Sequence, residues 1–125
     1  MTKGYVGWAL SEHTRNQLLH QFPPAYDRVI AHHCTLKFGV DDSHPLPTTT
    51  TAQVVGTVDD HMGVQALVLK IDGDISRADG SVYHITWSLG DGRRPVDSNK
   101  VIAAQGFVPL AEAIDIDIVP TFFAF

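Results

Sequence analysis

Two short patterns in this sequence carry residue types that can do acid–base chemistry. The triplet HCT, which begins at His33, recurs later in the chain as HIT, which begins at His84. Each triplet lies in a segment rich in β-forming residues, and alternate side chains of a strand point to the same face. We therefore expect His33 and Thr35 to emerge together from one strand, and His84 and Thr86 together from another. The opposite faces are apolar and expected to be buried: Cys34, Leu36 and Phe38 in the first strand, and Tyr83, Ile85, Trp87 and Leu89 in the second.

A pair of histidines suits the cleavage of a phosphodiester. The unperturbed pKa of histidine lies near neutrality, so one imidazole can act as general base while the other acts as general acid. A hydroxyl two positions further along can donate to a non-bridging phosphate oxygen and hold the group between the rings. Neither role needs a metal ion. The pattern predicts catalytic roles for His33 and His84 and phosphate-binding roles for Thr35 and Thr86.

Five further side chains are candidate accessory contacts to a substrate. Two share the predicted strand faces of the motif histidines, and two are cations of a Gly/Pro-rich loop that can clamp a phosphate or an RNA backbone. The fifth is a tyrosine of the first strand. It lies on the face opposite Trp8, so that one of these two rings packs in the core and the other can stack a base. The candidates are, in that order, Lys37 and Ser88, Arg93 and Arg94, and Tyr5.

Each motif residue also has a structural explanation, and we weigh both. A half-buried histidine can be satisfied by backbone carbonyls, and threonine is common in strands. The repetition of the whole pattern favours function over these alternatives. His32 should point away from His33 in a regular strand, so we interpret it as structural or peripheral. A metal site that combines these two with His84 is a third alternative, although no H-E-x-x-H or H-x-H spacing is present.

Hydrophobic patterning and turn signals define the elements that must position these residues. Ser11 can cap the first helix. A second, short helix over NKVIAAQ can begin at Asp97 or Ser98 and end at Gly106. The aromatic tail TFFAF needs cover, in the core or against a partner. The segments expected as strands are 5–10, 32–40, 52–58, 64–71, 81–89 and 113–119, with the first helix at 11–22.

Composition limits the class of protein. Of the 125 residues, 44% are hydrophobic and 18% charged, as in a soluble globular domain. The formal charge of −5 argues against a general nucleic-acid coat but leaves room for a small anion in a local pocket. A single cysteine excludes an internal disulfide and fits a reducing compartment. No apolar run is long enough to span a bilayer. We predict one cytoplasmic α+β domain over residues 1–125.

The two motifs make the sequence resemble a known family. The pair HCTLKF and HITWSL is similar to the H-x-T/S-hydrophobic motifs of the 2H phosphoesterase superfamily, which has one motif per lobe. That superfamily includes RNA 2′,3′-cyclic phosphodiesterases, the so-called 2′-5′ RNA ligases and viral phosphodiesterases of 2′,5′-oligoadenylates or cyclic oligonucleotides. The resemblance covers most of residues 5–89, in a chain shorter than most members. It implies bilobal antiparallel sheets around a central groove, with one or two outer helices.

The resulting hypothesis is a metal-independent phosphoesterase that uses no cofactor. Its substrate would be a 2′,3′-cyclic phosphate at an RNA or nucleotide end, or a related 2′,5′-linked or cyclic oligonucleotide. Which histidine is the base stays open at this stage. The sequence indicates no membrane partner and no obligate protein partner. The alternatives are a non-catalytic module that binds nucleotides or RNA ends in the same groove, and a metal-dependent hydrolase.

Overall fold

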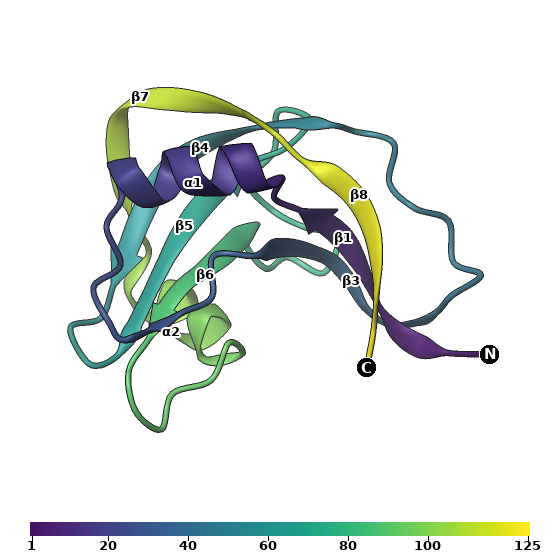
Figure 1. The fold of residues 1–125 in the computed structure, drawn as a ribbon, viewed down its shortest axis with the longest axis horizontal. Helices are drawn as coiled ribbons and strands as arrows, with labels where there is room; N and C mark the ends of the chain where they lie inside the picture. Colours follow the sequence, from purple (N-terminus) through teal and green to yellow (C-terminus); the bar gives the residue numbers. More distant parts are fainter.

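The strands of this protein form one antiparallel sheet that curls into a half-barrel (Figure 1). The computed structural model describes all 125 residues. Together with the two helices, the sheet makes the protein an α+β fold, as the sequence predicted. No helix has the length and apolar character needed to cross a membrane. The strands are β1 (Lys3–Ala9), β2 (Arg28–Val29), β3 (His33–Asp41), β4 (Thr51–Asp59), β5 (Val64–Lys70), β6 (His84–Leu89), β7 (Val108–Asp117) and β8 (Val119–Ala124).

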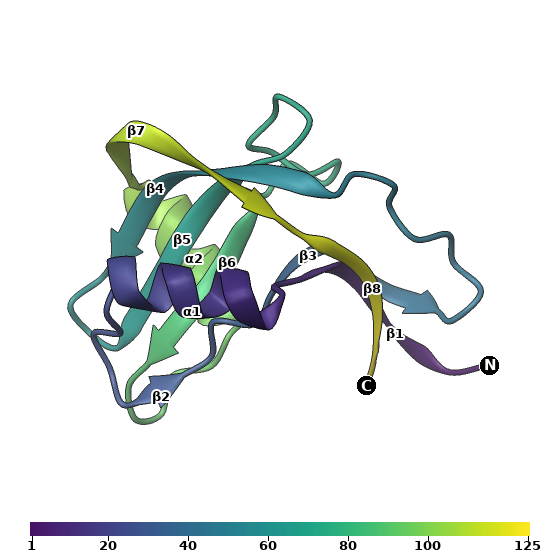
Figure 2. The ribbon, with the colours of Figure 1, turned by 45° about the horizontal axis from the view of Figure 1, so that its top comes forward.

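The single sheet can be divided at the Cys34–Ile85 pair into two parts, which we call lobes. Its strand order is β7-β4-β5-β6-β3-β1-β8, and β2 adds to β6. Strands β3 and β6 are paired only through Cys34 and Ile85. One lobe therefore holds β4 to β7 and the other β1, β3 and β8, joined into a single sheet. Strands β7 and β8 follow each other as one long arc that pairs with β4 at one end and β1 at the other (Figure 2).

The two helices cover opposite faces of the β4–β6 region (Figure 2). Helix α1 (Glu12–Gln21) begins after Ser11, whose hydroxyl accepts from the Thr14 amide at 3.2 Å, as expected for an N-cap. Its buried Leu18 belongs to the larger hydrophobic cluster, with Trp87. Helix α2 (Asp97–Gln105) packs its apolar residues into the second cluster, against β5. Both faces of β5 are buried, which explains its nearly continuous apolar sequence VQALVLK.

The ends of α2 differ in part from the expected caps. The N-cap is Val96, which makes no side-chain cap hydrogen bond, and Asp97 is the first helical residue. The Asp97 carboxylate instead accepts from the amide of Arg94 at 2.9 Å. Gly106 ends the helix as predicted, with a φ of 72° that a residue with a side chain rarely adopts.

The C-terminal part of the chain contributes more strand than the sequence indicated. Strand β7 begins several residues before the expected 113–119 segment, and in it the half-buried Ile114 and buried Ile116 alternate with exposed aspartates. The aromatic tail forms β8 and pairs with β1 in register from Gly4 to Ala9. Most of its side chains are half-buried, and Phe125 is 70% exposed. The tail therefore completes the sheet without being sealed in the core.

Each motif strand carries a β-bulge at the residue that follows its His-x-Thr triplet. In β3, Gly7 pairs with Thr35 and Val6 with Lys37, which leaves Leu36 as the extra residue. In β6, Ala66 pairs with Thr86 and the next pair lies two positions further along, which leaves Trp87 extra. A bulge reverses which face the following side chains occupy. Leu36 and Trp87 still pack with the larger hydrophobic cluster as expected, whereas Lys37, Phe38 and Ser88 do not lie on the faces that regular alternation predicts.

Candidate active site

The four motif side chains come together on one face of the sheet, at the junction of the lobes. Cys34 and Ile85 lie opposite each other and are 1% and 0% exposed, so they point into the core. Their neighbours in the two strands point to the other face. Both histidines and both threonines line one pocket of about 460 Å³. A larger pocket of about 640 Å³ between α1 and β7 contains none of the motif residues.

His84 is held in a defined orientation by the backbone. Its Nδ1 lies 2.9 Å from the carbonyl oxygen of Val82. Because a carbonyl can only accept, Nδ1 carries the proton, and Nε2 is the nitrogen available for proton transfer. Burial lowers the pKa of His84, the hydrogen bond to Val82 opposes this, and the positive charge of Arg77 lowers the pKa further. The ring therefore favours its neutral form at neutral pH.

His33 is surrounded by other rings. Its ring centroid lies 5.3 Å from that of Tyr5 and 5.0 Å from that of Phe123. Burial, followed by the charges of His32 and His84, lowers the pKa of His33 to about 4. Its Nδ1 contacts the Nδ1 of His32 at 3.1 Å. The expectation that His32 points away was wrong, because His32 lies just before β3 and strand alternation does not apply to it.

The two threonines differ in their surroundings. Thr86 is only 8% exposed. Its hydroxyl lies 2.9 Å from the hydroxyl of the fully buried Ser98 on α2 and 3.4 Å from the carbonyl oxygen of Pro95. Thr35 is half-buried in the wall of the pocket. The Thr35 side is therefore the more open position for a ligand oxygen, while Thr86 connects β6 to α2.

Arg77 is a site residue that sequence reasoning missed. Its side chain is 10% exposed and lines the pocket between the two motifs. The guanidinium donates to the Thr35 carbonyl at 3.1 Å, to the Ser81 hydroxyl at 2.6 Å and to Asn99 at 3.2 Å. Asp79 lies 3.7 Å away. The sequence gives no signal for this, because Arg77 lies in a polar turn that only the fold brings against β3.

The bulges move two expected accessory residues out of the pocket. Lys37 is exposed and does not line it, and Phe38 takes the pocket face instead. Ser88 is fully buried outside the pocket, where its hydroxyl donates to Gln65 at 2.5 Å and accepts from the Tyr26 amide at 3.2 Å. Neither side chain is placed to contact a ligand between the two histidines.

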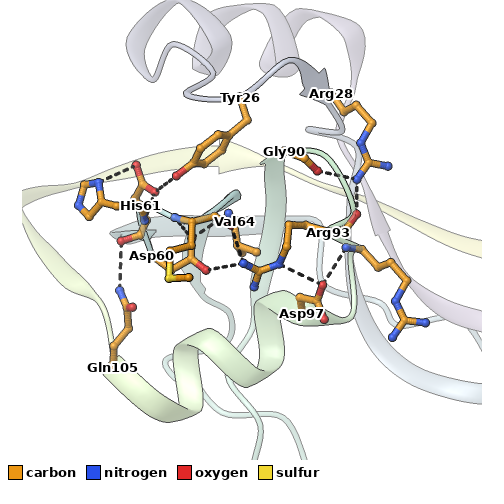
Figure 3. A network of polar contacts seen from close by, with 12 residues as sticks. Tyr26, Arg28, Asp60, His61, Val64, Gly90, Arg93, Asp97 and Gln105 are labelled. Carbon is orange, nitrogen blue, oxygen red and sulfur yellow. Dashed lines mark hydrogen bonds and ion pairs between the residues drawn. The ribbon is translucent and has the colours of Figure 1, made fainter.

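The two loop arginines also lie outside the pocket. Arg93 forms ion pairs with Asp60 at 3.1 Å and Asp97 at 3.4 Å, and donates to the Met62 carbonyl at 2.6 Å (Figure 3). Its charge is therefore used within the chain, where it ties the β4–β5 turn to the start of α2. Arg94 is exposed and is absent from the residues that line the pocket.

Of the two rings on β1, Tyr5 reaches the site. Tyr5 lines the pocket, while Trp8 is 3% exposed in the core and donates its indole N–H to the Thr49 carbonyl at 2.9 Å. The structure thus places Trp8 in the core and Tyr5 at the pocket, which the sequence left open.

The chain offers no group of three or more His, Cys, Asp and Glu side chains arranged to hold a metal ion. Comparisons with protein-family models, with curated proteins and with solved structures find no significant match to this chain.

Proposed function

We propose that this protein is a hydrolase of the 2H phosphoesterase type, which cleaves a 2′,3′-cyclic phosphate or a related 2′,5′-linked or cyclic oligonucleotide without a metal ion. The observation that carries the proposal is the convergence of two imidazoles from separate lobes on one solvent-open pocket. The resemblance implies one motif in each lobe, and the proposal takes the strands on either side of the Cys34–Ile85 pair as these two lobes.

In the proposed reaction, His33 is the general base and His84 the general acid. Burial lowers the pKa of His33 to about 4, which keeps its ring neutral and ready to accept a proton. His84 has a fixed tautomer, and its protonated form presents Nε2–H as a donor. His33 takes a proton from water while the water oxygen attacks phosphorus. His84 protonates the leaving ribose oxygen as the P–O bond breaks, and the product is a phosphomonoester. Solvent exchange then restores both protonation states.

Charge on the reacting phosphate is balanced by polar groups that are already in place. The guanidinium of Arg77 supplies a fixed positive charge in a largely buried position. The hydroxyl of Thr35 can donate to a non-bridging oxygen. A bound phosphate anion also favours the charged form of a nearby imidazole, so substrate would raise the pKa of His84 towards the range in which it can act as an acid.

A second candidate function is a module that binds nucleotides or RNA ends in the same pocket without cleaving them. The hydrogen bonding of the Thr86 hydroxyl favours it, because this hydroxyl is engaged with Ser98 rather than open to a ligand. In that case the two histidines would bind phosphate oxygens but would not transfer protons.

The test is an incubation with nucleoside 2′,3′-cyclic phosphates and short 2′,5′-oligoadenylates in the presence of EDTA. Proton transfer by a positioned side chain contributes about 10²–10⁴-fold, so His33→Ala and His84→Ala should each reduce turnover by that factor. The matched control is His20→Ala, at an exposed position of α1. Turnover that survives both active-site substitutions would refute the mechanism. Binding without turnover would favour the module, and loss of turnover in EDTA would favour a metal-dependent enzyme.

A further inference from the structure

A row of aromatic rings crosses three strands next to the candidate active site. Tyr5 of β1 pairs with Phe38 of β3 on one side and with Phe123 of β8 on the other. The ring centroids lie 5.6 Å and 4.9 Å apart, with interplanar angles of 18° and 19°. Phe125 extends the row, with its centroid 5.0 Å from that of Phe38. We call these four residues the aromatic platform.

The platform is continuous with the pocket. Tyr5 and Phe38 line the pocket together with His33. The ring of His33 packs on Tyr5 and Phe123, so the platform begins at the imidazole that we assign as the base. A flat group attached to a phosphate held between the histidines would therefore reach these rings.

The outer part of the platform is open to solvent. Phe38 is 69% exposed and Phe125 is 70% exposed, although their rings touch. Two adjacent exposed phenylalanines leave apolar surface in water, and such patches commonly mark a binding site. The bulge at Leu36 is what places Phe38 here rather than in the core. The patch is thus produced by the same irregularity that shapes the site.

We propose that the aromatic platform is a stacking subsite for the nucleobases of an unpaired oligonucleotide whose phosphate occupies the pocket. This inference rests on the proposed function, because the two-histidine pocket supplies the phosphate end. Bases stack on aromatic side chains regardless of sequence, because every base has a π face. Stacking also suits a chain with a formal charge of −5, which cannot attract a nucleic-acid backbone through a broad basic surface. The platform extends beyond Tyr5, so it can accept more than one base.

Two consequences follow for substrate choice. Phosphodiesters that carry a base should be preferred to those that carry none. Oligonucleotides should be preferred to mononucleotides, because Phe125 offers stacking surface beyond the rings of Tyr5 and Phe38 that line the pocket. Each stacked base typically strengthens binding by about tenfold to a hundredfold.

The first test measures binding without turnover. A hexamer of deoxyadenylate and an abasic hexamer with the same number of phosphates are titrated into the wild type and into Phe38→Ala, Phe125→Ala and Met62→Ala. Met62 is a matched control because it is an apolar side chain, 75% exposed, in the β4–β5 turn and outside the pocket. We expect the base-containing hexamer to bind the wild type at least tenfold more tightly than the abasic one. The two phenylalanine variants should reduce this preference, and Met62→Ala should retain it.

The second test measures turnover. The ratio of kcat/KM for adenosine 2′,3′-cyclic phosphate to that for glycerol 1,2-cyclic phosphate, which has no base, should fall about tenfold in Phe38→Ala. If the ratio of kcat/KM for the two substrates is the same in wild type and variant, the stacking role of the aromatic platform is wrong, while the proposed hydrolase function is supported. If neither substrate is hydrolysed but the two hexamers show the expected difference in affinity, the stacking role of the aromatic platform is supported and the hydrolase proposal is wrong.

Equal binding of the two hexamers, or no binding of either, overturns the platform. So does a wild-type chain that sediments as a dimer while Phe38→Ala or Phe125→Ala sediments as a monomer, because the patch would then be covered by a second copy of the chain.

Discussion

The Nδ1 atoms of His32 and His33 lie 3.1 Å apart, so that one ring donates to the other. His84, in contrast, donates its Nδ1 proton to a backbone carbonyl. The two imidazoles of the site are therefore held by different partners. The partner of His33 is an imidazole, which can carry a charge, whereas the partner of His84 is the Val82 carbonyl, which cannot. His32 is therefore expected to orient the ring of His33.

Replacing His32 with alanine should change the pH dependence of activity as well as its size. The charge of His32 is one of the causes that lower the pKa of His33, after burial. Without it, the pKa of His33 should rise, and the acidic limb of the kcat/KM profile should move to higher pH. We expect kcat/KM at neutral pH to fall about tenfold because the ring loses its orientation. A lower kcat/KM with no shift of the acidic limb would contradict the role of His32 in positioning His33. The control variant is His20→Ala.

The stability of the folded chain should decrease as the pH falls from about 6.5 to about 4. The pKa of His33 is lowered to about 4 in the folded state, while an unfolded histidine titrates near 6.5. In this window the unfolded chain binds more protons than the folded chain. The free energy of unfolding therefore decreases as the pH is lowered. His84 contributes with the same sign. Chemical denaturation of wild type and His33→Gln at pH 4.5 and 7 should show a weaker pH dependence in the variant. Equal pH dependence would argue against a half-buried, neutral His33.

Much of this arrangement could be predicted from the sequence, because it depends on local patterns. The two triplets, the Ser11 cap and the hairpin of β4 and β5 all follow from residue types at short spacing. The bulges at Leu36 and Trp87 do not, since a bulge depends on the partner strand as well as the bulged one. For this reason the roles expected for Lys37 and Ser88 failed together.

Arg77 and Phe38 show the other limit of sequence reading. Arg77 stands in a turn whose composition indicates only a loop, and its position depends on the packing of that turn against β3 and α2. Strand alternation predicts that Phe38 is a core residue. The bulge at Leu36 places Phe38 on the pocket face instead. Contacts between distant segments therefore determine the positions of both Arg77 and Phe38.

Ser88 should matter for stability and not for activity. Its buried hydroxyl bonds Gln65 and the Tyr26 amide. Ser88→Ala leaves both groups without this partner, which typically costs about 1–3 kcal/mol for buried polar groups. We expect a lower free energy of unfolding with unchanged kcat/KM for a nucleoside 2′,3′-cyclic phosphate. A large loss of kcat/KM in folded protein would restore Ser88 as a substrate contact.

Removing the guanidinium of Arg77 should weaken anion binding. We expect Arg77→Gln to raise the dissociation constant of inorganic phosphate by at least tenfold, because a largely buried positive charge is lost from the pocket. Asp79→Asn should act in the opposite direction, since it removes a negative charge 3.7 Å from Arg77. Its carboxylate is 68% exposed, so we expect a change of about two- to threefold at low salt. Calorimetric titration with phosphate measures both, and equal affinities in all three proteins would exclude Arg77 from anion binding.

The most direct test of a shared phosphate site is a phosphate titration followed through the side-chain nitrogen resonances of the histidines. We expect the signals of His33 and His84 to shift together with one dissociation constant, and the pKa of at least one of the two rings to rise when phosphate binds. The signals of the exposed His20 and His61 should stay in place. A shift of only one of the two rings, or shifts with separate dissociation constants, would contradict the claim that both imidazoles face the same phosphorus atom.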